Sequence, residues 1–231
     1  MRLRTRGKVV VIMSAILASG GVARAGAEEE IRSVYDQYRE AMLAKAGETA
    51  ASLMSKESIA YHQTNRDLAL DATREVLKQR LFVEQNQVLL LRLRMTREEL
   101  EKLSGQALVA HLVSKGWVTM PGTTQATLGK VQVEGVEALG QSMIGEREGA
   151  LDYFRFAKEE AGWRVDSAYS AKRGEQSLKS MQRSQDPEQF VTTIVMSVSQ
   201  MPVDESIWEP LRKDNPGRLE SHSPLPDAKT P

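Results

Sequence analysis

Residues 126–168 constrain the fold most, because they form a run of short alternating segments separated by glycines. In the last two segments, Phe154 and Phe156 share one face, and Trp163 and Val165 share one face. This period of two predicts strands of a sheet that has one buried side. Glycines at the junctions supply the positive φ angles that tight hairpins need. We therefore expect strands near 126–134, 136–145, 150–158 and 162–168.

Residues 1–25 have the layout of a secretory signal peptide. A basic start is followed by an apolar run from Val9 to Ala18, and Ala23 and Ala25 provide the small residues of a cleavage site. The apolar run is about half of the roughly 20 residues that a permanent membrane helix needs, so an uncleaved anchor is the weaker alternative. The chain has no cysteine, which excludes a lipid-modified lipoprotein. We expect a periplasmic or secreted protein with no stable membrane span after signal removal.

Charge and composition exclude several function classes. Removal of the five basic residues in 1–25 leaves 26 basic and 31 acidic side chains, a net charge of −5. A mildly acidic exported protein is a poor nucleic-acid binder, because that function depends on a basic surface. With no cysteine and three histidines far apart in sequence, we expect no metal site and no cofactor. No phosphate-binding glycine loop and no serine-nucleophile elbow is present.

The remainder of the chain has mostly helical periodicity. Residues 89–95 alternate like a strand but lie between helices, so we favour a helix there. Thr96 and Glu99 form a capping box, and Gly116 is placed to end the helix before it. Trp208 is expected to anchor the C-terminal segment on the chain's own body. We expect helices over 28–45, 48–54, 55–80, 106–115 and 188–198, a polar linker over 169–185 and a disordered tail over 213–231.

Two segments resemble the nuclear transport factor two-like superfamily, which includes the SnoaL-like domains. They are the helix segment from Ile31 to Tyr38 and the hairpin from Phe154 to Asp166. The resemblance implies an α+β fold over 26–168, in which N-terminal helices pack on a curved antiparallel sheet to form a cone-shaped roll. The helical insertion at about 56–118 departs from that family. Residues 169–212 are expected to pack their helix on the roll. The resemblance also implies a pocket at the wide end of the roll and a homodimer formed through the sheet.

Five residues are candidates for a ligand site in such a pocket. Tyr38 lies on the core stripe of the first helix, and Tyr61 and His62 are adjacent on a later one. Adjacent helical residues point about 100° apart, so we do not expect both to line one cavity. Asp152 and Tyr153 lie on the third strand. None of the five matches a catalytic motif of the family, so their catalytic roles stay unknown.

The function that we predict from these patterns is non-catalytic. We expect an exported binding or accessory protein of the bacterial envelope, with a small apolar ligand or an envelope protein as partner. The alternative is a small-molecule isomerase, dehydratase or hydrolase that uses a pocket aspartate or histidine as general base, for which burial must bring the pKa near the working pH. Asp166, beside Arg164, is expected to point outward.

Overall fold

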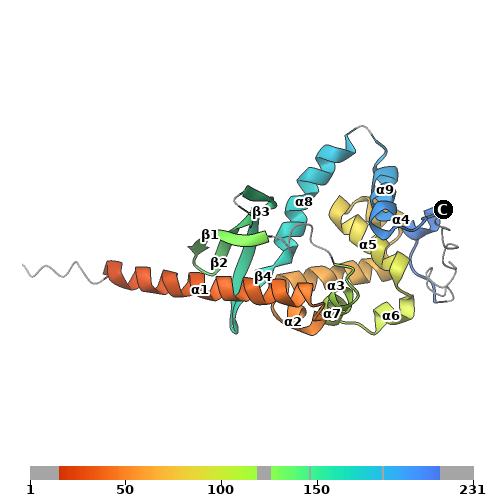
Figure 1. Cartoon of the computed structure of the whole chain (residues 1–231). Helices are drawn as coiled ribbons and strands as arrows, with labels where there is room; N and C mark the ends of the chain where they lie inside the picture. The colour runs from red at the N-terminus through yellow and green to blue at the C-terminus, as the bar shows by residue number, and fades with distance from the viewer. Residues whose placement is uncertain (1–15, 119–125, 146, 184, 214–231) are drawn as a thin grey trace, which may run out of the picture.

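The protein is an α+β molecule, with a four-stranded antiparallel sheet at one end and a block of helices at the other (Figure 1). The structure, a computed structural model, describes residues 16–118, 126–145, 147–183 and 185–213. Within these residues there are nine α-helices. The expected tail, apart from Lys213, and the first part of the expected signal peptide lie outside the described residues.

The sheet confirms the strand pattern. Its strands are β1 (Ala126–Glu134), β2 (Glu137–Ile144), β3 (Arg147–Glu159) and β4 (Gly162–Asp166), hydrogen-bonded in the order β1-β2-β3-β4. Phe156 pairs with Val165, and Phe154 lies opposite Gly140. Gly162 has a φ of 105°, which a side chain would strain. Phe154, Phe156, Trp163 and Val165 are all at most 2% exposed, so the predicted face is the buried one.

Helix α1 (Ile16–Leu43) lies along this buried face (Figure 1). Ile31, Tyr35 and Tyr38 are buried on its predicted stripe, and the Tyr35 ring contacts Phe154 with centroids 4.9 Å apart. The Tyr35 hydroxyl donates to the Ala126 carbonyl over 3.0 Å. The helix begins earlier than expected and is continuous past Ala25, so removal of residues 1–25 stays a prediction. Among the described residues, no helix has the length and apolar character needed to span a membrane.

Six further helices follow α1 and form the predicted helical region. The segment between the first two of them hydrogen-bonds to β4, because Ser55 N donates to the Val165 carbonyl and Val165 N donates to the Leu53 carbonyl, both over 2.9 Å. The alternating segment 89–95 is helical up to Arg94, as favoured, and the Thr96 capping box is present. The six are α2 (Gly47–Ser52), α3 (Lys56–Asp71), α4 (Arg74–Lys78), α5 (Phe82–Arg94), α6 (Arg97–Glu101) and α7 (Gly105–Ser114).

The predicted helix over 55–80 is two helices. The chain is extended at Ala72 and Thr73, where ψ is 129° and 165°. The Thr73 hydroxyl then accepts the Val76 N–H and caps α4. A threonine favours such a helix start because its side chain replaces a missing backbone acceptor. The break turns α4 toward the C-terminal helices, where Arg74 pairs with Glu188.

The segment 169–185 is not a linker. Residues Ser167–Gln182 form helix α8, which packs on α3, α5 and β3. Its buried positions are Ala168, Ser170 and Glu175, so the packed face is small and polar and shows no apolar stripe. The Glu175 carboxylate accepts the Val83 N–H at the start of α5. Polar contacts therefore hold this helix against its neighbours. The prediction of a linker relied on the lack of a hydrophobic pattern, which such contacts do not produce.

Asp166 points inward, contrary to the prediction. It is 1% exposed, accepts from Arg155 Nη1 at 2.8 Å and from Ser58 Oγ at 3.3 Å, and caps α8 through the Tyr169 N–H. Strand β4 ends at Asp166. The rule that successive strand residues point to opposite faces of the sheet therefore no longer applies to it. An aspartate at a helix N-cap satisfies a backbone donor and complements the helix dipole.

The C-terminal helix packs on the helical block rather than on the sheet. Helix α9 (Pro187–Ser199) places Phe190, Val191 and Val195 against α5, and a short 3₁₀ helix, η1 (Glu205–Trp208), follows. Trp208 is 2% exposed, as expected for an anchor on the chain's own body. Two hydrophobic clusters result, one between the sheet and α1 and one inside the helical block.

Candidate functional site

A cavity of about 490 Å³ lies between the two hydrophobic clusters, with walls from α3, α5 and α8. Its volume is within the roughly 300–1,000 Å³ of small-molecule sites. Apolar side chains make most of the wall. They are Met54, Val83, Leu90, Leu91, Leu112, Trp117, Val118, Ala171, Leu178 and Val198.

Tyr61 and His62 both line this cavity, which corrects the expectation that adjacent helical residues would not. Their rings contact edge to face, with centroids 5.6 Å apart and planes at 74°. The pair points in different directions around α3, but α5 and α8 both pack on that helix. The cavity bounded by these three helices therefore reaches both side chains.

Three buried polar atoms in the cavity wall have no hydrogen-bond partner among the described residues. They are Tyr61 Oη, Asn65 Oδ1 and Ser167 Oγ. Tyr61 is 8% exposed and Asn65 is 1% exposed. The Asn65 amide nitrogen donates to Gln87 Oε1 over 2.8 Å, which fixes the orientation of its carbonyl. Since an unsatisfied buried polar atom costs roughly 1–3 kcal/mol, a wall with three of them indicates a surface that receives polar atoms from a bound molecule or from water.

Burial favours the neutral forms of His62 and Tyr61. It lowers the pKa of His62 to about 4, so the imidazole is uncharged near pH 7. It raises the pKa of Tyr61 to about 12, although the nearby Asn65 side chain opposes this shift. No carboxylate is part of the wall as the structure describes it. The pair therefore offers hydrogen bonds to a ligand rather than a ready proton acceptor.

Arg94 is the single charged side chain in the described wall. Its guanidinium carbon lies 5.3 Å from the centroid of the Trp117 ring, which also lines the cavity. Partial burial lowers the pKa of Arg94. Within the described residues, no carboxylate forms an ion pair with it. A cation thus faces an apolar cavity with an aromatic ring beside it.

Of the other three predicted site residues, Tyr38 is part of the described cavity wall and Tyr153 is not. Tyr38 reaches the cavity from α1, is 1% exposed, and has its pKa raised by burial. Tyr153 is half-buried on β3 and is not part of the cavity wall. Asp152 lies on β3, but its side chain is outside what the structure describes. Any role of these two residues in ligand binding stays a prediction.

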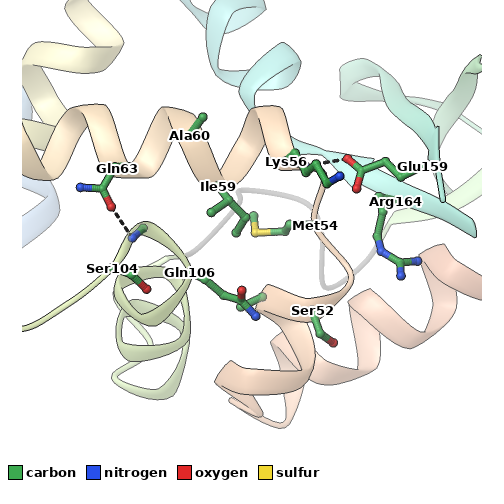
Figure 2. Close-up of a pocket in the computed structure, with 12 residues that line it drawn as sticks. Ser52, Met54, Lys56, Ile59, Ala60, Gln63, Ser104, Gln106, Glu159 and Arg164 are labelled. Atoms are coloured by element: carbon green, nitrogen blue, oxygen red, sulfur yellow. Dashed lines mark hydrogen bonds between the residues drawn. The ribbon is translucent and has the colours of Figure 1, made fainter. Parts of the chain in front are cut away.

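A second hollow of about 550 Å³ is an open groove between α2, α3, α7 and the β3–β4 hairpin (Figure 2). Two of its polar side chains already bond backbone groups of the protein. Gln63 Oε1 accepts the Gly105 N–H over 2.6 Å, and Glu159 Oε1 accepts the Lys56 N–H over 2.7 Å (Figure 2). These contacts tie the helices and the hairpin together. The cavity between α3, α5 and α8 is the better candidate site, because its wall is mostly apolar and contains unpartnered polar atoms.

Sequence reasoning missed most of the cavity wall. A signal for Arg94 exists, because Arg92 and Arg94 interrupt the apolar run 88–95. Asn65, Ser167 and Trp117 come from three separate segments, and no spacing in the sequence joins them. In the described residues, no cluster of histidine, aspartate and glutamate has the arrangement of a metal site.

Comparison with known proteins found no matching family model, no similar curated protein and no similar solved structure.

Proposed function

We propose that this protein binds a small molecule with an apolar body in the cavity between α3, α5 and α8. The observation that carries the proposal is a largely apolar cavity of about 490 Å³ whose wall contains buried polar atoms with no partner among the described residues. Ligand sites combine apolar walls with a few placed polar groups in this way. Binding without chemical conversion is the role that this wall supports best.

The proposal also includes export to the bacterial envelope and a likeness to a known fold. The signal-peptide layout of 1–25 supports an exported protein of the bacterial envelope. Helices packed on one face of an antiparallel sheet support a likeness to the nuclear transport factor two-like roll, including its cone shape. In that roll the pocket would lie at the wide end of the cone, whereas here the proposed site lies between α3, α5 and α8.

A second candidate is an enzyme that uses His62 and Tyr61 on a small molecule. One observation favours it, because the two side chains meet in one cavity. A pKa of about 4 makes the His62 imidazole a weak general base near neutral pH, since an efficient base has a pKa near the working pH. The wall also supplies no carboxylate to strengthen it. Binding is therefore the first proposal.

Gly174 allows a matched test of the binding site. It lies in the cavity wall on α8, and a Cβ added there meets nothing within 4 Å. We expect N-phenyl-1-naphthylamine, an uncharged apolar fluorophore, to bind the wild type and Gly174→Ala with equal affinity. Gly174→Leu extends a side chain toward the cavity and should weaken binding by at least about tenfold, the effect of losing roughly 1.4 kcal/mol.

The same titration contradicts the proposal under two outcomes. One is no saturable fluorescence change with any of the three proteins. The other is equal affinity for all three, which would place the fluorophore elsewhere. Mass spectrometry of small molecules recovered after incubation separates the two candidate functions, because a binding protein returns them with unchanged mass.

A further inference from the structure

The charged residue in the cavity wall indicates the chemical class of the ligand. Arg94 is half-buried, stands over the Trp117 ring, and has no carboxylate partner among the described residues. A guanidinium presents a planar fork of N–H donors that matches a carboxylate or a phosphate. An apolar cavity with one such donor group at its wall is complementary to a molecule that has an apolar body and an anionic end.

A structural role for Arg94 explains less of what is observed. As the last residue of α5, it complements the negative end of the helix dipole. That effect accounts for a cation at the position but not for its place against an apolar cavity. Structural arginines of this block instead use their donors within the protein. Arg97, three residues later, bonds the Leu70 and Leu211 carbonyls and pairs with Asp71.

The number of charges narrows the class further. A phosphate monoester carries about −1.5 to −2 at pH 7, whereas a carboxylate carries −1. The described wall contributes one cation, and its histidine is neutral because burial lowers its pKa to about 4. A single positive charge balances a single negative one. A doubly charged head group would leave charge uncompensated in a partly desolvated place.

We propose that the ligand is an amphipathic monocarboxylate, with its apolar body in the cavity and its carboxylate paired with Arg94 beside Trp117. The proposal rests on the proposed function, since it names the ligand class of the same cavity. The polar atoms of Tyr61, Asn65 and Ser167 then face the ligand body and are available to a hydroxyl on it or to water.

The test compares three probes that differ in the head group. Dodecanoate, dodecanol and dodecyl phosphate, each below its critical micelle concentration, displace N-phenyl-1-naphthylamine from the purified chain. We expect dodecanoate to bind at least about tenfold more tightly than dodecanol, the gain of one charge-assisted pair. It should also bind more tightly than dodecyl phosphate, whose second negative charge has no cation in the described wall. Arg94→Met should remove the preference for dodecanoate over dodecanol and leave dodecanol affinity within about twofold. Arg94→Lys should keep part of it, because lysine supplies the charge without the fork.

Arg164→Met is the matched control, because Arg164 lines the open groove and donates to the Trp163 carbonyl. It should bind all three probes as the wild type does. Equal binding of dodecanoate and dodecanol, or tighter binding of dodecyl phosphate, would overturn the carboxylate assignment while the binding function stands. A preference for dodecanoate that survives Arg94→Met would also overturn it. Displacement by none of the probes, with no fluorophore binding, would instead refute the proposed function.

Discussion

Helix α5 carries two arginines two residues apart, and they occupy opposite environments. Arg92 is 1% exposed and donates to five backbone carbonyls, those of Leu68, Ala69, Ala72, Ile207 and Trp208, over 2.5–3.2 Å. Arg94 has an aromatic ring beside it and no ion-pair partner in the described wall. Residues two apart on a helix point about 200° from each other, so one faces the packed block and the other the cavity.

This difference indicates that the two arginines of α5 have different roles. On the packed side, the guanidinium satisfies carbonyls where α3 ends and where η1 crosses, so it joins two segments far apart in the sequence. On the cavity side, the Arg94 guanidinium retains donors that no described residue accepts. Variants on the two sides should therefore affect different properties: stability on the first side and binding on the second.

The largest effect is expected from Arg92→Met. It removes a donor from five carbonyls of two separate segments, of which the Leu68 carbonyl keeps the Ala72 N–H. We expect a loss of about 4 kcal/mol in the free energy of unfolding, because each buried acceptor left unsatisfied costs roughly 1–3 kcal/mol. Urea unfolding followed by circular dichroism measures it.

Arg94→Met is the matched control for that measurement and should change the free energy of unfolding by less than about 1 kcal/mol. Arg92→Lys extends the test if Arg92→Met does not fold. It should lie between the other two, since one ammonium cannot reach all five carbonyls. Equal losses at both arginines would remove the contrast between the two sides of α5.

The sheet could be predicted from sequence more fully than the cavity. Phe154, Phe156, Trp163 and Val165 alternate because each strand buries one face, and this period is visible in the letters. The cavity wall has no such period, since Tyr61, Arg94 and Ser167 come from three helices. Their meeting depends on how those helices pack, which is a tertiary property.

Helix α8 shows a second reason why part of the structure could not be predicted from the sequence. Its buried face consists of Ala168, Ser170 and Glu175, so local hydrophobicity indicates a linker. The helix forms because Asp166 caps it and because polar groups such as Glu175 find partners on α5. Helix stability that comes from polar tertiary contacts leaves little trace in a hydrophobic pattern.

A second prediction concerns His62 and pH. Burial lowers the pKa of His62 to about 4 in the folded protein, against about 6.5 in an unfolded chain. Between these pH values the unfolded chain binds the proton and the folded protein does not. Stability should therefore fall as the pH decreases from about 6.5 to 4, by up to about 3 kcal/mol, and change no further below that range on account of this residue.

His62→Gln is the control, because glutamine does not titrate. The difference between the two stability–pH curves isolates the histidine from the carboxylates, which titrate in both proteins. Parallel curves from pH 4 to 7 would show that water enters the cavity freely and hydrates the imidazole. That result would contradict the burial of the His62 side chain, which is 6% exposed.

Two tyrosines should respond differently to the loss of the hydroxyl. The Tyr35 hydroxyl donates to the Ala126 carbonyl over 3.0 Å, whereas the Tyr61 hydroxyl has no partner at hydrogen-bond geometry. We expect Tyr35→Phe to destabilise the protein by about 1 kcal/mol and Tyr61→Phe to stabilise it or leave it unchanged. Thermal unfolding without ligand measures both. A loss at Tyr61 equal to that at Tyr35 would show a strong water-mediated bond at the cavity wall.

The smallest effect is expected from Gly174→Ala on the cavity side of α8. A Cβ there meets nothing within 4 Å, so alanine removes backbone freedom from the unfolded chain without a clash. The free energy of unfolding should rise by about 0.5–1 kcal/mol. Gly47→Ala should instead destabilise, because its Cβ would lie 2.0 Å from the Ala110 carbonyl oxygen where α2 packs on α7. A loss of stability at Gly174 as well would mean that this part of the wall is packed, and the cavity would then be smaller than its described wall implies.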